Sequence, residues 1–253
     1  MATFETIIFE KKDRIGYVTL NRPQVLNAYN IKMRDELYEV LSAIKADPEV
    51  AVCVVKGAGD KAFCAGADLS EFLTAPPPVF ARRARFARDI WGVFMSVPQP
   101  MIAAIHGYVL GSGLEIALFC DIRIASEDVQ FSVPEMGLGI ITAAGASQTL
   151  PRAVNRGPAL DWLLTGRWIK SAESLRFGLV NSVVPRAELL VTAQKMAERI
   201  RMMDPDEVRS IKEAINRGMD MSLDEGLELE TRLASRLLKS KMSVSRKYVR
   251  EGK

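Results

Sequence analysis

The stretch HGYVLGSGLEIALFCD, residues 106–121, decides the fold and the chemistry expected of this chain. Glycines and a serine stand directly ahead of a glutamate, and the apolar residues from Leu114 onward predict a short buried helix. Glycine allows tight turns and a close approach of the backbone to a ligand. The amides near Ser112 and Gly113 then lie at a helix N-terminus, where unsatisfied N–H groups favour negative charge. Such amides can hold a carbonyl oxygen as it becomes an oxyanion.

Glu115 is the unusual residue of this stretch, because it is a carboxylate within an apolar run. We expect it to be largely buried, and a buried carboxylate without a partner either raises its pKa or acquires partners. Two interpretations remain open at this point. Glu115 is one half of a catalytic pair, or it belongs to a buried ion pair with an arginine.

Glu135, in FSVPEMGLG at residues 131–139, is the second unusual carboxylate. Pro134 fixes the approach of the chain, and Gly137 and Gly139 leave room beside the side chain. A loop carboxylate between apolar residues is a candidate for a raised pKa, which suits proton transfer near neutral pH. The alternative is an ordinary exposed turn residue.

A third motif, FCAGADL at residues 63–69, offers amides rather than side chains. Ala65, Gly66 and Ala67 have side chains too small for chemistry. A donor N–H from Ala67, facing the amide of Ser112, would complete an oxyanion hole with two donors. Alone, such a loop is usually only a turn.

The regions around these motifs indicate an α/β protein. Residues 5–23 predict two strands, residues 31–48 a helix with apolar residues at helical spacing, and residues 50–57 a buried strand. A strand, helix, strand order is typical of an α/β domain. Residues 101–111 predict one further strand.

From about residue 145 onward the pattern turns helical. We therefore divide the chain into an α/β core that holds the active site, residues 1–190, and a helical C-terminal region, residues 191–253.

Composition excludes several classes of function. The 34 basic and 31 acidic side chains nearly balance, which argues against nucleic acid as the principal partner. A single histidine, His106, rules out most metal sites and Ser/His/Asp schemes. Carboxylates and backbone amides remain as the agents of any chemistry.

The same composition predicts a cytoplasmic location. The first residues, MATFETIIFEKKDR, carry charges where a secretory signal needs an apolar stretch, and the sequence has no apolar run of about 18 residues to span a membrane. Cys53, Cys64 and Cys120 have no metal-ligand or redox spacing, which fits a reducing compartment.

Three of the motifs, AFCAGADL, IAAIHGYVLGSGLEIALFCDI and FSVPEMGLGI, resemble the crotonase superfamily of enoyl-CoA hydratases and isomerases. The resemblance extends from VTLNRPQVLNA, residues 18–28, to LTGRWIKSAESLRFGLVNSVV, residues 164–184. It implies a ClpP/crotonase-like spiral of ββα units and a helical C-terminal region that forms trimers, often as a hexameric dimer of trimers. It also implies acyl-CoA thioester substrates and no resident cofactor or metal, since coenzyme A is part of the substrate.

The resemblance assigns roles to four residues. Ala67 and Ser112 match the two oxyanion-hole positions, and Glu115 and Glu135 match the two catalytic glutamates of true hydratases. Glu115 would help to activate the attacking water, and Glu135 would exchange the proton at the substrate α-carbon. The positions expected to meet coenzyme A or the acyl group are Gln24, Val25, Ala28, Ala65, Gly66, Ala67, Asp68, Leu69, Gly111, Ser112, Pro134, Glu135 and Gly137.

The activity implied is reversible hydration of an α,β-unsaturated acyl-CoA. An isomerase or other crotonase-type thioester chemistry is the alternative, because one glutamate can move a proton between allylic carbons. A non-catalytic binding protein with the same fold is a third possibility. The loop LTAPPPVF, residues 73–80, and the helix around Trp91 are expected to line the acyl pocket.

The sequence departs from the family pattern in three places. Ser112 replaces a small alanine or glycine and adds a hydroxyl group. TAAGA, residues 142–146, replaces a common PGAGG. The segment SKMSVSRKYVREGK, residues 240–253, lacks the AF…KR pattern of the usual final helix, which in relatives often contacts coenzyme A or a neighbouring subunit, and Lys247 and Tyr248 are possible substitutes.

Overall fold

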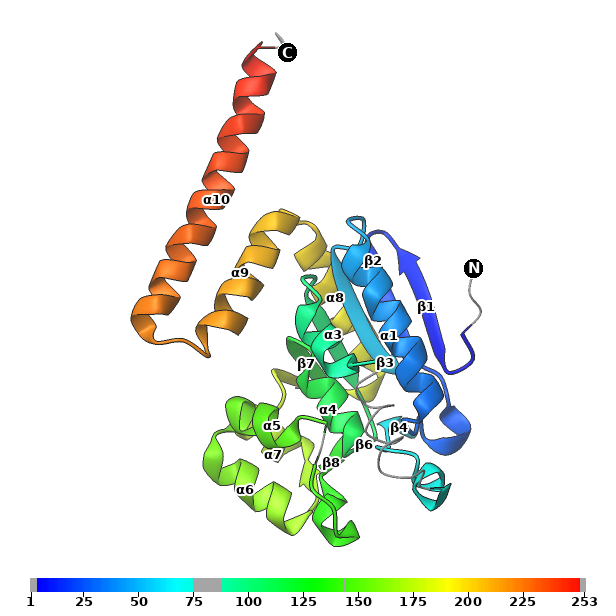
Figure 1. The fold of residues 1–253 in the computed structure, drawn as a ribbon. Coiled ribbons are helices and arrows are strands. Elements are labelled where there is room, and N and C mark those ends of the chain that lie inside the picture. Colours follow the sequence, from blue (N-terminus) through cyan, green and yellow to red (C-terminus); the bar gives the residue numbers. More distant parts are fainter. Residues whose placement is uncertain (1–3, 75–87, 143, 251–253) are drawn as a thin grey trace.

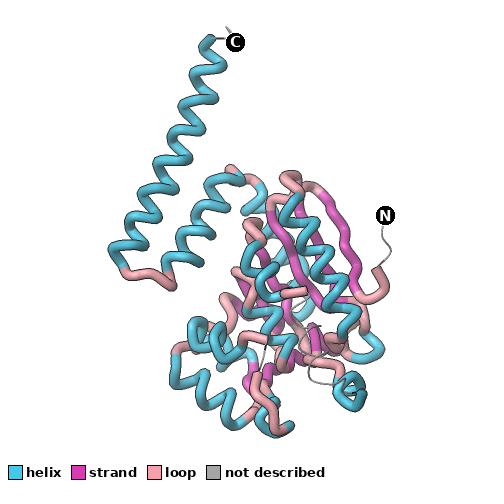
Figure 2. The backbone as a smooth tube through the Cα atoms, in the orientation of Figure 1, coloured by secondary structure: helices cyan, strands magenta, loops and turns pink. Residues whose placement is uncertain are grey.

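Two β-sheets with helices packed around them form the body of the molecule (Figures 1 and 2). The computed structural model describes residues 4–74, 88–142 and 144–250. Part of the expected acyl-pocket loop, from residue 75 onward, lies outside these ranges, as does residue 143. Within the described ranges no helix is long and apolar enough to cross a membrane.

The larger sheet has six strands in the order β1-β2-β3-β5-β7-β10. Strands β1 and β2 are antiparallel, and the neighbours from β2 to β10 are parallel. The bounds are β1 Ile7–Lys12, β2 Ile15–Leu20, β3 Val52–Gly57, β5 Met101–Ile105, β7 Ile122–Ser126 and β10 Ser182–Val184. The predicted strands in residues 5–23 and 50–57 are confirmed.

Both faces of the larger sheet are covered at its central strands, which explains the apolar runs of β3 and β5. Successive residues of β3, such as Cys53 and Val54, point to opposite faces of the sheet and belong to different apolar clusters. One face packs under α1 (Ile31–Ala46), α3 (Ile90–Ser96) and α4 (Ser112–Leu118). The other packs against α8 (Leu189–Arg201) (Figure 1).

The smaller sheet is made of β4 (Ala62–Cys64), β6 (Tyr108–Leu110), β8 (Gln130–Ser132) and β9 (Ile169–Lys170), in that order. Strands β4, β6 and β8 are parallel, and β9 is antiparallel to β8. The chain passes from the larger sheet to the smaller one at Gly107, whose φ is +55° and where a side chain would overlap the carbonyl oxygen of Lys61. The single strand predicted over residues 101–111 was therefore wrong: it is two strands in two sheets.

Helices α5 (Ala146–Val154) and α6 (Arg156–Thr165) lie between β8 and β9 in the chain, and α7 (Ser171–Arg176) follows β9. After α8, helices α9 (Pro205–Gly218) and α10 (Leu223–Arg250) form a hairpin, in which α9 contacts the body through Lys212 and α10 stands away from it (Figures 1 and 2). Helix α10 continues to Arg250, so the C-terminal segment is helical although it lacks the AF…KR pattern. The segment can be helical because no glycine or proline interrupts it before Gly252.

Helix α1 begins with a side-chain cap and buries one face. The Oδ1 atom of Asn30 accepts a hydrogen bond from the Met33 amide at 2.9 Å. The apolar residues that predicted this helix, among them Leu37, Leu41 and Ile44, are fully buried.

The same helix holds β1 through Glu36, a carboxylate that is only 9% exposed. Its Oε2 atom accepts from the Thr6 amide at 2.7 Å, the Thr6 hydroxyl at 2.6 Å and the Ile7 amide at 3.1 Å, and Oε1 accepts from the Glu5 amide at 3.0 Å. Burial works to raise the pKa of Glu36, but these hydrogen bonds outweigh it and hold the pKa below its ordinary value.

Replacing Glu36 with alanine is expected to lower the free energy of unfolding by about 2–3 kcal/mol at pH 7, because four donors lose their acceptor. A depressed folded pKa stabilises the protein above the ordinary pKa of 4.5, and this contribution fades as the pH falls through the folded value. Urea denaturation at neutral pH and below pH 4 should show this difference shrinking in acid. The control Glu39→Ala changes an exposed residue of the same helix and should cost no more than about 0.5 kcal/mol; an equal loss in both variants would contradict the prediction.

Candidate active site

The three motifs meet because they follow three neighbouring parallel strands. The loop 65–68 follows β4, the segment Gly111–Ser112 follows β6, and Pro134–Glu135 follows β8. The carboxyl ends of parallel strands lie at one edge of a sheet, which is where open α/β sheets bind ligands. Segments far apart in sequence are thereby brought to one place.

The loop after β4 leaves the amide of Ala67 turned outward. Ala67 forms an isolated parallel bridge with Tyr29, and its hydrogen bonds run through the residues on either side. The Tyr29 amide donates to the Gly66 carbonyl oxygen at 2.7 Å, and the Asp68 amide donates to the Tyr29 carbonyl oxygen at 2.9 Å. The N–H of Ala67 is antiparallel to the Gly66 carbonyl in the same peptide plane, so it points away from Tyr29.

Helix α4 presents its first amides beside this loop. Gly111, with φ +43°, precedes the helix, and the Glu115 amide donates to the Gly111 carbonyl oxygen at 3.0 Å. The amides of Ser112 and Gly113 therefore belong to the first turn, which has no intrahelical acceptors. A side chain at Gly113 would overlap the backbone of Cys64 at the end of β4, so this helix end packs directly against the strand that leads to Ala67.

Glu115 is 1% exposed. Its Oε1 atom accepts hydrogen bonds from the amides of Ala144, at 3.2 Å, and Ala146, at 3.0 Å. Burial raises the pKa of Glu115 to about 7, the charge of Glu135 adds to this, and the two amides and the Ser112 hydroxyl offset part of it. No ion pair to Glu115 occurs within the described ranges, so the arginine partner considered from the sequence is not seen there.

Glu135 lies in the short helix η3 (Pro134–Leu138) and turns its carboxyl group inward, whereas the residues after it are exposed. Its Oε1 atom lies against Gly111, where a Cβ atom would come within 2.5 Å of it. Its Oε2 atom is buried and has no hydrogen-bond partner in the described part of the chain. Burial raises the pKa of Glu135 above its ordinary value, a shift in the direction that favours a proton donor.

The other candidate positions lie around the same loops. Gln24 and Val25 belong to the short helix η1 (Pro23–Val25) and are exposed. Leu69, at the start of η2 (Leu69–Thr74), is 57% exposed. A Cβ atom at Gly137 would have no neighbour within 4 Å, as expected of a position beside an open surface.

Trp91 on α3 lies near α4 and Tyr29. Its ring stacks on Phe119 at 5.2 Å between centroids and approaches the Tyr29 ring at 5.9 Å. Phe119 follows Glu115 by one helical turn, since its amide donates to the Glu115 carbonyl oxygen at 3.1 Å. Whether these rings line an acyl pocket stays a prediction.

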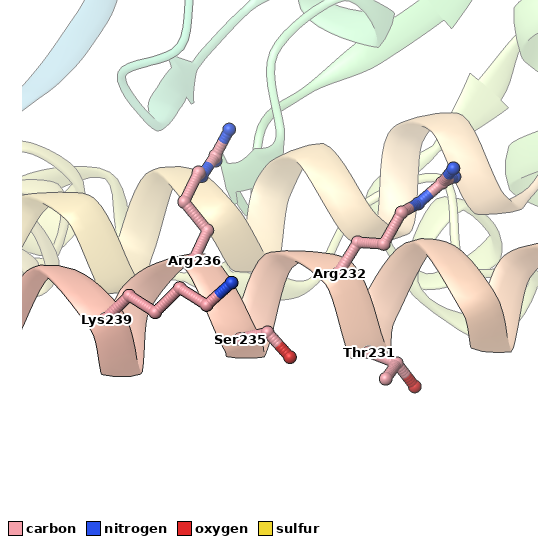
Figure 3. A pocket seen from close by; sticks show the side chains of 5 residues that line it. All are labelled: Thr231, Arg232, Ser235, Arg236 and Lys239. Carbon is pink, nitrogen blue, oxygen red and sulfur yellow. The ribbon is translucent and has the colours of Figure 1, made fainter.

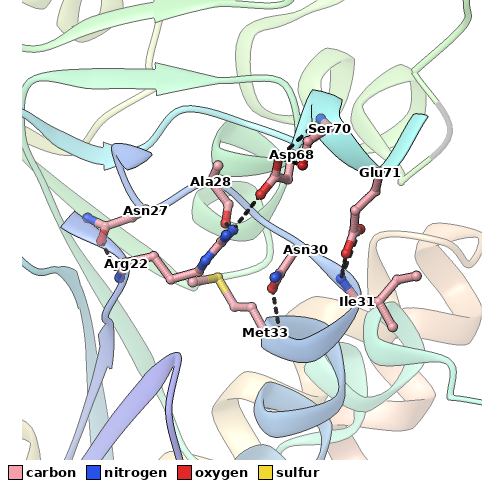
Figure 4. Close-up of polar contacts among 9 residues, drawn as sticks. All are labelled: Arg22, Asn27, Ala28, Asn30, Ile31, Met33, Asp68, Ser70 and Glu71. Carbon is pink, nitrogen blue, oxygen red and sulfur yellow. Dashed lines mark hydrogen bonds and ion pairs between the residues drawn. The ribbon is translucent and has the colours of Figure 1, made fainter. Parts of the chain in front are cut away.

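Two sets of contacts at the site were not predicted from the sequence. One set is the pair of amides, Ala144 and Ala146, that hold Glu115. The other is a network of Arg22, Asn27 and Asp68 behind the Ala67 loop (Figure 4). Backbone amides leave no trace in side-chain identity, although the polar residues in NRPQVLNA could have drawn attention to the second set.

A surface hollow elsewhere has no part in this arrangement. It is lined by Thr231, Arg232, Ser235, Arg236 and Lys239, all from α10 (Figure 3). None of the motif residues lines it, so the convergence of strand ends, and not this hollow, identifies the site. Among the described residues, no three histidine, cysteine or acidic side chains gather as a metal ion would require.

Comparison with known proteins gives one family. The model of a family described as enoyl-CoA hydratase/isomerase matches residues 10–251. A probable enoyl-CoA hydratase of Mycobacterium tuberculosis is 42% identical over 234 residues, covering 91% of this chain and 89% of the relative. A short-chain-enoyl-CoA hydratase of Clostridium acetobutylicum is 40% identical over 225 residues, covering 89% and 86%. The crystal structure of an enoyl-CoA hydratase from Bacillus anthracis matches with a TM-score of 0.90 at 34% identity, covering 98% of this chain and 97% of that one.

Proposed function

This chain belongs to the enoyl-CoA hydratase/isomerase family, and on that premise we propose that it adds water reversibly to α,β-unsaturated acyl-CoA thioesters. The observation that carries the proposal is the meeting of two buried carboxyl groups, Glu115 and Glu135, at one edge of the smaller sheet. The amides of Ala67 and Ser112 lie at the ends of the adjoining strands.

In the proposed reaction the thioester carbonyl lies between the amides of Ala67 and Ser112. Attack of water at the β-carbon forms a C–O bond and pushes electrons onto the carbonyl oxygen, which becomes an enolate. Two fixed N–H donors stabilise that charge, and losing one such donor typically costs about 3 kcal/mol. No resident cofactor takes part in this scheme.

Two proton transfers complete the hydration. Ionised Glu115 takes a proton from the attacking water, and protonated Glu135 delivers one to the α-carbon as the enolate collapses. The sum is one water added across the double bond. Burial raises the pKa of Glu135, which favours its protonated form, and the amides of Ala144 and Ala146 hold Oε1 of Glu115 in place beside it.

Hydration is favoured over isomerisation by the presence of both carboxyl groups, since allylic proton transfer needs only one. Among the relatives, a protein of Syntrophomonas wolfei 37% identical over 228 residues is named a crotonyl-CoA hydratase. Burying a carboxyl group is costly. A purely binding role would therefore give no reason to keep two buried carboxyl groups beside the amides of Ala67 and Ser112.

The proposal is tested by adding the protein to crotonyl-CoA and to longer, branched and aromatic enoyl-CoA thioesters. Hydration removes the conjugated double bond, so the enoyl absorbance should fall, and mass spectrometry should show the addition of water. Movement of the double bond along the acyl chain without addition of water would favour the isomerase. Binding of thioesters without any reaction would favour the binding protein.

The dependence of kcat/KM on pH should show an ascending limb near neutral pH. The rate should rise with pH through about 7, because only ionised Glu115 can accept a proton. Initial rates between about pH 5 and pH 9 test the profile. The control Glu127→Gln removes an exposed carboxylate and should leave the ascending limb unchanged. A rate independent of pH near 7 would contradict the assignment of Glu115.

We further propose a cytoplasmic homotrimer or a hexamer built from two trimers. The hairpin of α9 and α10 exposes large apolar side chains that a monomer would leave in water, among them Ile215 at 58% and Leu223 at 78% exposed. Light scattering should then give three or six times the chain mass of 28.0 kDa.

A further inference from the structure

Arg22, which follows β2, joins two segments at the back of the Ala67 loop. One guanidinium nitrogen, Nη1, donates to the Ala28 carbonyl oxygen at 2.6 Å and to Asp68 Oδ2 at 2.8 Å (Figure 4). The side chains of Arg22 and Asp68 are each only 16% exposed. A charged pair this well covered is held in one geometry, because separating its members would leave a poorly hydrated charge.

The segment between Arg22 and Tyr29 is held in an unfavourable backbone conformation. Leu26 and Asn27 have φ values of +54° and +56°, in the left-handed region. Asn27 fixes this turn, because its Nδ2 atom donates to the carbonyl oxygens of Ala58 and Ala62 at 2.9 Å and its Oδ1 atom accepts from the Arg22 amide at 2.9 Å. Strained backbone that is fixed from several sides is typical of functional sites.

A continuous chain of hydrogen bonds leads from Arg22 to the Ala67 amide. The Ala28 carbonyl that Arg22 binds shares a peptide plane with the Tyr29 N–H, and that N–H donates to the Gly66 carbonyl oxygen at 2.7 Å. The Gly66 carbonyl in turn shares a peptide plane with the Ala67 N–H. Two peptides therefore connect a guanidinium cation to the N–H group that faces the site.

Asp68 fixes the other end of the same loop. Its Oδ1 atom accepts from the Ser70 hydroxyl at 2.6 Å and the Ser70 amide at 3.2 Å, while Oδ2 holds Arg22. Its amide donates to the Tyr29 carbonyl oxygen at 2.9 Å. The peptide that carries the Ala67 N–H is thus fixed from both sides, and the donor cannot rotate without breaking this network.

We propose that Arg22, held by Asp68, is a positioning residue that aligns and polarises the Ala67 amide through these two peptides. Hydrogen bonds in a chain polarise one another, and a cation at the start strengthens each donor in turn. The inference rests on the proposed function, in which Ala67 is one of the two donors to the thioester oxygen. Arg22 itself touches no substrate in this arrangement.

The test is the carbonyl stretching band of a bound thioester, measured by infrared difference spectroscopy with crotonyl-CoA labelled with carbon-13 at the carbonyl. A weaker donor polarises the carbonyl less, so Arg22→Met should move the band to higher wavenumber than in the wild type. The same variant should lower kcat by about 10- to 100-fold, a part of the loss seen when an oxyanion donor is removed, with KM changed far less. Arg22→Lys keeps the charge, so its band position and its kcat should lie between those of the wild type and those of Arg22→Met.

Two further variants separate positioning from stability. Asp68→Asn and the double variant Arg22→Met/Asp68→Asn should show band shifts no larger than that of Arg22→Met, because the two residues act through one chain. The control Lys212→Met breaks an ion pair of similar burial, 2.7 Å from Lys212 Nζ to Asp121 Oδ2, and should leave band and kcat unchanged.

An unshifted band in folded Arg22→Met would overturn the inference, as would additive shifts in the double variant. If the wild type binds the thioester without hydrating it, the hydratase proposal fails while the band still decides the role of Arg22. A wild type that binds no thioester overturns both.

Discussion

Glu135→Gln should lower kcat/KM for enoyl-CoA hydration by a factor of about 10³, within the range that a positioned general acid contributes. Glutamine keeps the size and shape of the side chain, so its contact with Gly111 is preserved. The glutamine amide cannot donate a proton near neutral pH, so the α-carbon would have to take its proton from water. The loss should fall on kcat, with KM changed little.

The assay is the fall in absorbance of the best enoyl-CoA substrate, compared with binding of the saturated acyl-CoA. The control Glu127→Gln removes the same charge from an exposed position beyond β7 and should keep wild-type rates. If Glu135→Gln stays within about tenfold of the wild type, proton delivery to the α-carbon does not depend on this residue.

Glu115→Gln should abolish most activity and at the same time stabilise the protein above neutral pH. The folded pKa of about 7 exceeds the ordinary value of 4.5, so the wild type is most stable below about 4.5 and loses stability as the pH rises through 7. The cost above pH 7 amounts to about 3 kcal/mol for a shift of this size. Glutamine carries no charge, and its oxygen can still accept from the amides of Ala144 and Ala146.

Urea denaturation of the two proteins at about pH 5 and pH 8 would measure this effect. The free energies of unfolding should nearly coincide in acid, and the variant should be the more stable protein at the higher pH. A variant less stable than the wild type at pH 8 would show that the ionised carboxylate is compensated in the folded state. Ionised Glu115, the form that accepts the proton, would then not lower the free energy of unfolding.

The fold class follows from the sequence where the signal is a motif or a regular period. The crotonase-type α/β fold expected from three motifs is confirmed by solved enoyl-CoA hydratases with TM-scores of 0.90. Helix α1 was predictable because its apolar residues repeat at helical spacing before Pro48. The division of residues 101–111 between two sheets was not, since one apolar run suits either sheet and only Gly107 marks the change.

The candidate site was predictable to the extent that it depends on residues with an unusual chemical character. Two glutamates in apolar surroundings are visible in the sequence, and the structure brings both to one edge of the smaller sheet. The amides that hold Glu115, and the peptides that connect Arg22 to Ala67, were not predictable. Every residue has the same amide, so only the tertiary fold decides which ones are aimed at a site.

The donors proposed for the thioester oxygen are main-chain groups at Ala67 and Ser112, and this has a consequence for mutagenesis. Replacing either side chain leaves the N–H in place, so an alanine scan would pass over the groups that activate the substrate. Among the coded amino acids only proline lacks the N–H. The lining of such a site can therefore diversify toward new acyl groups while its activating groups remain out of reach of ordinary point mutation.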